Sequence, residues 1–564
     1  MRKHWSVWFL AWMMAAALVA CAEVPDSAVD SAQPTPGPAS EETAAIAGML
    51  PDSEFYFLEE TEALAPYYAE ANARKEAILN TPTAIVKGDT FIPGETYTGT
   101  AYYVSPNGND ENDGRSPETA WRSPERTTWG DVQEGDAVFF ERGGIYRLTE
   151  NPIRLISNVT YSAYGEGPKP VLTIVQENSA QPEYWELWYE GENGEKIWRY
   201  HQALGDVGGI VFDDTDYARR VLEWPTPDGW LAVDVLPMDP VNGLCAPEDP
   251  CTNISIKSAG EYREVAEQLT EDLTYISRVD FTGLSYPVDF YLDYRVGDLY
   301  LRCDGGNPAD CFEDIAILSI QRNSYGDVYG SILDGYHADG FVLDNLSLKY
   351  YLDNALSSSL DRAKGAVIQN CTVEWGGNSL FQFESAEPTN NFYLIGDGIY
   401  CVANDATIRN NYMRQGGNAC TFENNGTQVS DMGTYLAEGN LVENCGQGMR
   451  TYFIEPDFTN VFDALILRDN IILDTGNGLN NACAEMPASM DLGTAGVQFA
   501  REFEISGNIL LGSTMAIFRV PQHDSVQMQI HDNVIAQAKD GVLICEMPLS
   551  NPDIQWYLIY LCNE

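Results

Sequence analysis

The sequence predicts an all-β fold in which short parallel strands are wound into a solenoid. The prediction depends on three observations: a repeat in the second half of the chain, one polar residue type that recurs within it, and the lack of helical patterns between its copies. Steps of 25 to 40 residues between short strands are typical of coils that stack on one another. Seven segments of the form apolar-x-apolar-x-x-Asn-apolar align on Asn345, Cys371, Asn411, Asn440, Asn470, Asn508 and Asn533.

Asn has a physical reason to recur at one corner of such coils. It tolerates the left-handed backbone conformation, and its amide can bond the next Asn along the stack. Cys371 interrupts an otherwise uniform row. We therefore expect a ladder of Asn side chains along one edge, with Ile, Leu, Val and Phe pointing inward in continuous rows.

The N-terminus has the composition of an export signal followed by a tether. Residues 1–20 contain two basic residues and then an apolar run, as signal peptides do. The run that ends at Cys21 resembles a bacterial lipoprotein processing box, so we expect lipid on Cys21 and a cell-surface location without a membrane span. An ordinary cleaved signal is the alternative. Residues 21–45, rich in Pro, Ser, Ala and acids, are predicted to be a disordered tether.

Four regions are predicted after the tether. Residues 46–95 should form a short helical cap and lead-in, and residues 96–175 the first coils of the solenoid. Residues 176–330 interrupt the pattern with aromatic, hairpin-like strands, which indicate an antiparallel β-rich insertion. Residues 331–564 carry the main coils.

The charge of the chain is strongly acidic, with 84 Asp and Glu against 32 Lys and Arg, a formal net charge of -52. Such a surface repels nucleic acid, anionic membranes and polyanionic substrates, unless a cation bridges the substrate. The sequence has no Cys/His zinc spacing, and its one EF-hand-like loop lacks the twelfth-position acid. We therefore predict no cofactor and no dedicated metal site, with Ca²⁺ binding by stacked acids left open. We also expect a monomer.

The run Tyr102–Trp121, YYVSPNGNDENDGRSPETAW, is followed by GDAVFFERGGIYR, so a strand, a rigid Asx-Gly loop and another strand succeed one another. This run resembles the N-terminal rung of secreted right-handed parallel β-helix proteins, which include many polysaccharide lyases and glycoside hydrolases. As architecture, the resemblance covers most of residues 100–545. It implies a right-handed parallel β-helix in an exported protein.

A second resemblance concerns residues 396–424, GDGIYCVANDATIRNNYMRQGGNACTFEN. They look like core rungs of β-helix glycosidases of the β-xylosidase type, which carry an Asp on one strand and a Glu on a later one. The match implies a functional role for Glu423. The Asp position is Val402 here, so Asp397 just before the strand, or Asp405 just after it, would have to substitute.

Acids recur at the ends of the second strands, among them Glu384, Glu423 and Glu455. Stacked carboxylates raise one another's pKa, which suits a general acid beside an ionised partner in glycoside cleavage. A solvated rim is the alternative reading of these acids. The candidate substrate-binding residues are Arg450, which could hold a sugar carboxylate, and three aromatic residues whose rings could stack on sugars: Tyr400, Tyr452 and Trp375.

The sequence thus predicts a cell-surface glycoside hydrolase that acts on a polysaccharide. Glu423 would protonate the leaving oxygen and Asp397 would be the nucleophile or base, with Glu455 and Glu384 as second choices. One alternative is a Ca²⁺-assisted lyase of uronate polymers, with Arg450 near the base position. The other is a non-catalytic glycan-binding or adhesive protein, which the Val402 position favours.

Overall fold

The computed structural model describes most of the chain after residue 57, for some strands as backbone alone. The described residues are 58, 60–191, 194, 196–202, 204, 207–220, 223–226, 229–232, 238–239, 243–244, 289–293, 298–322, 324, 328–358, 363–377, 379–382, 392–401, 403–424, 433–453, 462–476, 488–492, 500–513, 516–519, 527–536 and 558–560.

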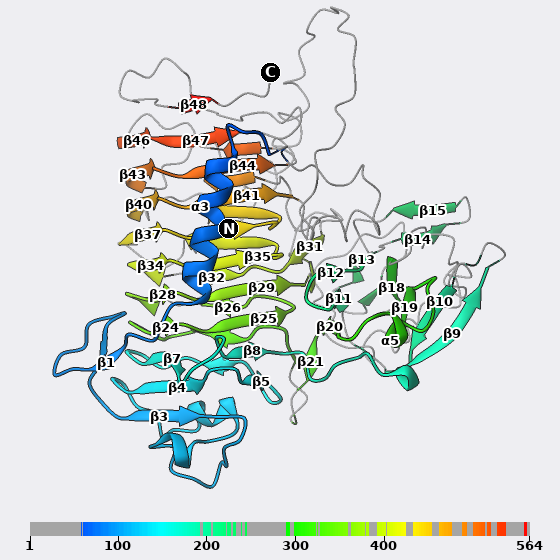
Figure 1. Cartoon of the computed structure of the whole chain (residues 1–564), viewed down its shortest axis with the longest axis horizontal. Helices are drawn as coiled ribbons and strands as arrows, with labels where there is room; N and C mark the ends of the chain where they lie inside the picture. The colour runs from blue at the N-terminus through cyan, green and yellow to red at the C-terminus, as the bar shows by residue number, and fades with distance from the viewer. Residues whose placement is uncertain are drawn as a thin grey trace, which may run out of the picture.

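Three long parallel sheets form the walls of a right-handed parallel β-helix, so the predicted fold class is confirmed (Figure 1). Successive coils add one strand to each sheet at a spacing of about 4.8 Å. Sheet 1 contains β3 (Ala101–Val104), β4 (Ala137–Glu141), β7 (Thr160–Tyr164), β24 (Val342–Asp344), β28 (Val367–Gln369), β34 (Ala406–Arg409), β37 (Thr434–Glu438), β40 (Phe462–Arg468), β43 (Ala500–Ser506) and β46 (Gln527–His531).

The other two walls follow the same order along the stack. Sheet 2 contains β5 (Ile145–Arg147), β8 (Val171–Thr173), β25 (Ser347–Tyr351), β29 (Thr372–Gly376), β35 (Tyr412–Arg414), β38 (Leu441–Glu443), β41 (Ile471–Thr475), β44 (Ile509–Ser513), β47 (Asn533–Ala536) and β48 (Leu558–Tyr560). Sheet 3 contains β6 (Ile153–Arg154), β23 (Leu333–Asp334), β26 (Leu356–Ser357), β32 (Ile399–Cys401), β36 (Asn418–Asn424), β39 (Gln447–Phe453), β42 (Ala488–Leu492) and β45 (Ala516–Arg519).

The Asn ladder runs along the corner between sheets 1 and 2. The Oδ1 atom of Asn440 accepts hydrogen bonds from the backbone N (3.0 Å) and Nδ2 (3.1 Å) of Asn411, and Asn440 Nδ2 donates to Ile408 O at 2.9 Å. Equivalent bonds join Asn440 to Asn470, Asn470 to Asn508, and Asn508 to Asn533. All these Asn side chains are fully buried. The ladder therefore satisfies backbone groups that the corner would otherwise leave unpaired.

One end of the predicted ladder was misaligned by one residue. The strand register pairs Asp344 with Gln369, so Asn345 lies beside Asn370, and Cys371 lies beside Leu346. Cys371 does belong to the ladder row, since its backbone N donates to Asn411 Oδ1 at 2.9 Å. Asn345 belongs instead to the neighbouring row.

That neighbouring row adopts the left-handed conformation, with φ between 53° and 66°. The two properties expected of one Asn are thus divided between adjacent residues: the first makes the turn, and the second bonds along the stack. Asn, Asp and Gly are the residues that tolerate this conformation best. The row consists of Asn345, Asn370, Asn410, Gly439, Asp469, Gly507 and Asp532.

A second left-handed row forms the corner between sheets 2 and 3. It consists of Tyr350, Trp375, Gln415, Asn444, Asp474 and Gly512, with φ between 52° and 72°. For Tyr350 and Trp375 this backbone is strained, because a bulky side chain disfavours positive φ. Both residues pack against the apolar core of the insertion.

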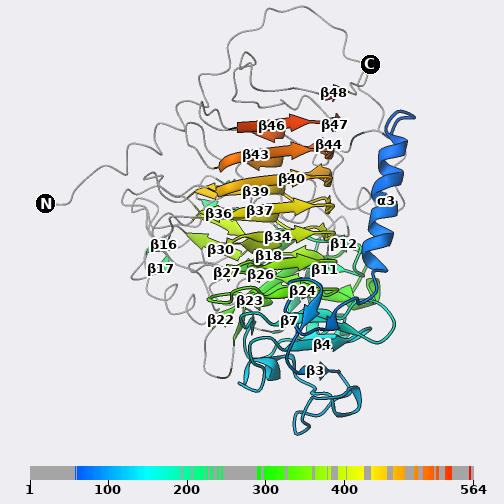
Figure 2. The same cartoon turned by 90° about the vertical axis from the view of Figure 1, so that its left-hand side faces the viewer.

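The N-terminal region covers one side of the stack. Helix α3 (Ala65–Leu79) crosses successive coils on the outer surface of sheet 2 (Figures 1 and 2). The N-cap residue Leu64 and the helix residues Ala71 and Ile78 pack against an apolar row of sheet 2 that includes Leu441 and Ile471. The lead-in then forms a small parallel pair, β1 (Val86–Lys87) with β2 (Thr96–Tyr97). No described helix has the length and apolar character needed to cross a membrane.

The turn-rich run Tyr102–Trp121 closes the first end of the solenoid. The Trp121 ring stacks on Tyr102 with centroids 4.8 Å apart, and a Cβ on Gly114 (φ +69°) would lie 2.5 Å from that ring. Asp110 Oδ1 accepts from the backbone N of Arg122 and of Ser123, both at 2.9 Å. The run includes the 3-10 helix η2 (Pro117–Thr119) and is followed by η3 (Pro124–Thr128). These contacts hold the loop rigid against the first coil.

The insertion is mainly antiparallel, as expected. One sheet joins β9 (Trp185–Glu190), β10 (Lys196–Tyr200), β19 (Asp298–Arg302), β18 (Asp289–Asp293) and β13 (Arg219–Arg220), of which only the β13 and β18 pair is parallel. A second sheet joins β12 (Asp216–Tyr217), β11 (Val207–Phe212) and β20 (Ile315–Ser319). Its apolar core includes Trp375 of the solenoid, so insertion and solenoid share packed side chains.

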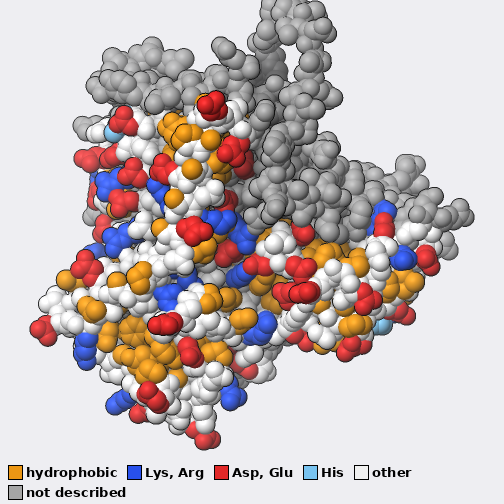
Figure 3. All heavy atoms as spheres, viewed as in Figure 1, with side chains coloured by type: hydrophobic (Ala, Val, Ile, Leu, Met, Phe, Trp, Pro, Cys, Tyr) orange, Lys and Arg blue, Asp and Glu red, His pale blue; other side chains and the backbone are white. Residues whose placement is uncertain are grey.

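The short elements complete the described fold. They are η4 (Pro182–Tyr184), α5 (Pro308–Cys311), and the strand pairs β14 (Glu223–Thr226) with β15 (Gly229–Ala232), β16 (Met238–Asp239) with β17 (Gly243–Leu244), β21 (Gln321–Arg322) with β22 (Val328–Tyr329), β27 (Ala363–Lys364) with β33 (Ala403–Asn404), and β30 (Ser379–Gln382) with β31 (Phe392–Ile395). Figure 3 shows Asp and Glu side chains spread over both the solenoid and the insertion, in agreement with the acidic composition.

Candidate functional site

Sheet 3 carries a row of polar side chains on its outer surface. Ile399, Cys420, Met449 and Met490 belong to the main apolar core, so the residues that alternate with them point outward. The register places four such residues on successive rungs: Tyr400, Thr421, Arg450 and Asp491. We call these four residues the outer row of sheet 3. Tyr400 and Arg450 are half-buried, whereas Thr421 and Asp491 are buried.

Asp397 lies at the edge of this row, in the turn that precedes β32. Its side chain is 5% exposed, and Asn418 Nδ2 donates to its Oδ1 at 2.6 Å. The Asp397 backbone N donates to Asn354 Oδ1 at 3.2 Å, which fixes the turn. Burial raises the pKa of Asp397 above its ordinary value, although the charge of Arg450 and the bonds from Asn418 oppose the rise. Asp397 therefore combines a raised pKa with a nearby cation.

A second carboxylate, Asp491, belongs to the outer row itself and is the second-to-last residue of β42. Gln447 Nε2 donates to Asp491 Oδ2 at 3.3 Å, and Arg450 pairs with Asp491 in the strand register. Both Gln447 and Asp491 are buried. Arg450 thus lies between two acids, one at each end of a short polar surface. Asn418, Gln447 and Asp491 were not predicted, because only the register reveals that Asn418 pairs with Gln447 and Arg450 with Asp491.

The sequence-predicted acids differ in how far the structure describes them. Glu423 lies in β36, two residues after Thr421, at a Cα distance of about 7 Å for an extended strand. Tyr452 is its register partner on β39. The side chains of Glu423 and Tyr452 are outside the described part of the structure, as are residues Glu384 and Glu455 altogether. Their proposed roles remain predictions.

Trp375 does not contribute to a sugar-binding surface, so that prediction was wrong. Its ring is fully buried in the interface between the solenoid and the insertion. Trp375 Nε1 donates to Asp214 Oδ1 at 2.6 Å, and the Arg414 guanidinium lies 5.1 Å from the ring centroid. An aromatic residue in a second strand can dock a neighbouring element as readily as it can bind a ligand.

A charged seam joins the insertion to the outer surface of sheet 2. We use this name for Lys349, Glu374 and Arg414, which occupy successive rungs, together with Asp214 of the insertion. Asp214 lies in the turn between β11 and β12 and forms ion pairs with Lys349 and, at 3.6 Å, with Arg414. Tyr350 Oη also donates to Asp214 Oδ1 at 3.2 Å.

The seam is balanced in charge. Arg414 Nε donates to Glu374 Oε2 at 2.7 Å. Burial acts to raise the pKa of Glu374, but the charges of Arg414 and Lys349 outweigh it and hold that pKa below its ordinary value. Two cations face two carboxylates, so the seam offers neither a free base nor a raised acid. Its geometry fits a docking contact, which also explains why Tyr350 and Trp375 are held in the left-handed conformation.

Within the described residues, no group of three or more His, Cys, Asp or Glu side chains is arranged to hold a metal ion. The six described cysteines are free thiols, including Cys303 and Cys311. The acids at the two ends of the outer row are separated by several rungs, so they do not form a compact oxygen cage of the kind Ca²⁺ prefers. Ca²⁺ binding therefore stays an open prediction.

The chain was compared with known proteins. No protein-family profile matches it, and no curated protein does. Among solved structures, a complex of XylC with xylose is similar at 12% identity and a TM-score of 0.42, covering 80% of this chain and 70% of that one. A structure named only as a glycoside hydrolase has 12% identity and a TM-score of 0.36, covering 80% and 89%.

A pectate lyase, Pel9A, has 9% identity and a TM-score of 0.35, covering 81% of this chain and 79% of that one. The similar structures named here thus include a glycoside hydrolase and a pectate lyase. At these scores the resemblance adds no argument about mechanism. The fold assignment depends on the ladder and the register of this chain itself.

Proposed function

We propose that this protein is an exported enzyme that degrades a polysaccharide, and that it acts by hydrolysis at the outer row of sheet 3. The observation that carries the proposal is the position of Asp397: a buried carboxyl with a raised pKa, beside Arg450 and at the edge of a polar surface. Burial of a carboxyl is how enzymes keep an acid protonated near neutral pH.

Asp397 fits the role of proton donor better than that of base. A donor must be protonated when the substrate binds, and burial raises the pKa of Asp397 in that direction. We therefore propose the reverse of the sequence-based assignment: Asp397 protonates the leaving oxygen, and Glu423 serves as nucleophile or base. The Asp397 carboxyl lies beside Asn418 and Thr421 of β36, and Glu423 follows Thr421 by two residues on the same face of that strand. A carboxyl pair needs a separation of about 5–10 Å.

The remaining residues of the row would hold the sugar. Tyr400 is half-buried on the rung of Asp397, so its ring can contact the apolar side of a pyranose. Arg450 and Asp491 can bond sugar hydroxyls, and Arg450 also stabilises ionised groups nearby. A net charge of -52 favours a neutral glycan over a polyanionic one.

The proposal is tested with the full chain and a panel of neutral and uronate polysaccharides, by measuring new reducing ends. The variants Asp397→Asn and Glu423→Gln should each lose at least about a hundredfold in rate, because removing an acid or base costs that much. Asp405→Asn is the matched control: Asp405 is exposed, and its Oδ1 accepts from Thr434 N at 2.8 Å, on the side of sheet 1. Its rate should not change. Equal rates in all three variants would contradict the proposal.

The same assay separates the two alternatives. A lyase would release an unsaturated, ultraviolet-absorbing product and would lose activity in chelator. A non-catalytic glycan-binding protein would retain the polysaccharide without releasing any product, and Glu423→Gln would leave that retention unchanged.

We also propose that lipid on Cys21 anchors the enzyme at the cell surface. The support is the sequence around Cys21 and the tether that follows it. Cys21→Ser should move the protein from the membrane fraction to the soluble fraction after export. An unchanged membrane fraction would refute the anchor.

A further inference from the structure

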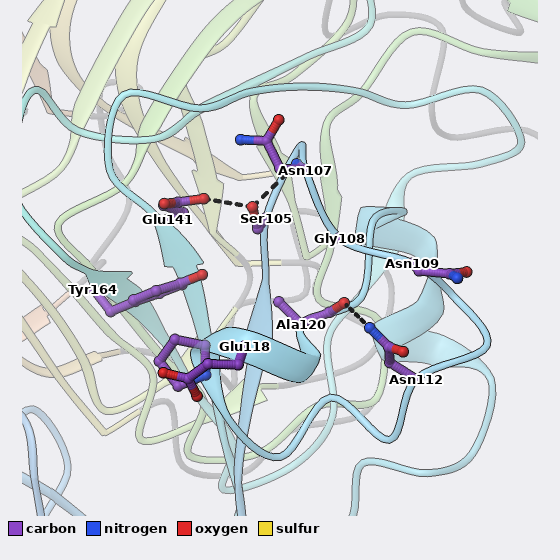
Figure 4. A pocket seen from close by; sticks show the side chains of 10 residues that line it. Ser105, Asn107, Gly108, Asn109, Asn112, Glu118, Ala120, Glu141 and Tyr164 are labelled. Carbon is purple, nitrogen blue, oxygen red and sulfur yellow. Dashed lines mark hydrogen bonds between the residues drawn. The ribbon is translucent and has the colours of Figure 1, made fainter.

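A pocket lies at the first end of the solenoid, away from the outer row of sheet 3. One wall comes from the carboxyl ends of the first three strands of sheet 1: Ser105 follows β3, Glu141 ends β4, and Tyr164 ends β7 (Figure 4). The register pairs Val104 with Phe140 and Glu141 with Tyr164, so these three residues form a column at rung spacing. The pocket has a volume of about 250 Å³.

The opposite wall is the turn-rich loop that the sequence analysis singled out. It contributes Asn107, Gly108, Asn109, Asn112, Pro117, Glu118 and Ala120. Asn112 Nδ2 donates to Ala120 O at 3.3 Å, which ties two parts of this wall together (Figure 4). Because Asp110 and Trp121 already hold the loop against the first coil, the pocket is formed before any ligand arrives.

The lining defines what the pocket can bind. It contains two carboxylates and no Lys, Arg or His, so it disfavours anions. Hydrogen bonds from its own backbone and from Ser116 hold the pKa of Glu118 below its ordinary value, so this group stays ionised. Burial and the charge of Glu141 raise the pKa of Tyr164 to about 12, so its hydroxyl remains a donor. A ligand rich in hydroxyl groups satisfies both kinds of partner.

A divalent cation fits less well. Glu141 Oε2 already accepts a hydrogen bond from the Ser105 hydroxyl. Ca²⁺ requires about six to eight oxygen ligands at close range, and the lining offers it only two carboxylates. A single sugar ring, by contrast, can place its hydroxyls against Glu141 and Glu118 and its apolar side against the Tyr164 ring.

We propose that this pocket binds one sugar residue of a neutral glycan. It lies three to four rungs from β32 and β36, which is about 14–19 Å along the stack. The site is independent of the hydrolysis proposed above, because binding here requires none of the residues of the outer row.

The test measures sugar binding to the full chain by saturation-transfer NMR and calorimetry. The probes are methyl β-D-xyloside, methyl β-D-galactoside and D-galacturonate. We expect a neutral glycoside to bind with a dissociation constant on the order of 1 mM, and galacturonate not to bind. Glu141→Gln should weaken binding about tenfold or more, because it removes a charged acceptor. Tyr164→Phe should weaken it less. Neither variant should change the rate of polysaccharide cleavage.

Glu111→Gln is the matched control, since Glu111 is an exposed acid of the same loop that does not line the pocket. Its binding should equal that of the unmodified chain, and circular dichroism should be unchanged in all three variants. Three results would each overturn the proposal: no neutral glycoside binds, sugar binding persists unchanged in Glu141→Gln, or Ca²⁺ binds at Glu141 and no sugar does.

Discussion

Replacing Asn440 by Ala should destabilise the solenoid far more than an exposed substitution would. The Asn440 side chain makes four hydrogen bonds in a fully buried corner: two from Asn411, one to Ile408 O and one to Asn470 Oδ1. After truncation, Asn411 Nδ2 still bonds Ile368 O, and Asn470 Oδ1 still accepts from the Asn440 backbone. The Asn411 backbone N and Ile408 O lose these partners.

Two buried polar groups without their partners cost about 2–6 kcal/mol in the free energy of unfolding, at about 1–3 kcal/mol each. The matched control is Cys371→Ala, in the same row and equally buried. Its thiol makes only a weak contact with Gln369 O at 3.2 Å, so this change should cost about 1 kcal/mol, chiefly through lost packing.

The assay is urea unfolding followed by circular dichroism, with the shift in midpoint multiplied by the slope of the transition. A larger shift for Asn440→Ala than for Cys371→Ala is expected. If the two variants unfold at the same urea concentration, the ladder does not stabilise the corner as argued, and the hydrogen bonds along the stack contribute nothing beyond packing.

Three further predictions concern other parts of the molecule. Asp214→Ala should release the insertion from sheet 2, so limited proteolysis should cut within residues 176–330 while the solenoid stays intact; unchanged cleavage would contradict the docking role. Burial raises the pKa of Asp474 to about 7. The contribution of its protonated form to stability should therefore be fully present near pH 4 and be lost as pH rises through 7. The variant Asp474→Asn should remove this dependence of the urea midpoint on pH. After export to an oxidising compartment, Cys303 and Cys311, whose thiols interact, should form a disulfide, visible as the loss of two alkylation sites; full labelling of both would refute it.

The architecture could be predicted because each coil of the second half of the chain contains the same pattern of apolar residues and Asn. The sequence could not predict whether Asn345 belongs to the ladder row or to the neighbouring left-handed row. Segments such as Asp344-Asn345-Leu346 and Asn410-Asn411-Tyr412 each offer an Asn, but only strand pairing decides which column that Asn joins. The error has a physical origin: the corner uses two adjacent rows, and both favour Asn.

The candidate site was predictable only in part, for a similar reason. Asp397 and Arg450 are charged residues within or just before the predicted second strands, and both are visible as such in the sequence. Asp491 lies 94 residues beyond Asp397 along the chain and joins the row only through stacking. The docking role of Trp375 depends on Asp214, which comes from an insertion with its own fold, so no local pattern could reveal it.

The most direct test of the central claim is a crystal structure of Asp397→Asn bound to an oligosaccharide that the unmodified protein cleaves. The account predicts the scissile bond beside residue 397, with the sugar in contact with Tyr400 and Arg450 on the outer row of sheet 3. An oligosaccharide bound on sheet 1 or sheet 2 with the outer row empty would contradict it, as would a failure of the unmodified protein to cleave any glycan.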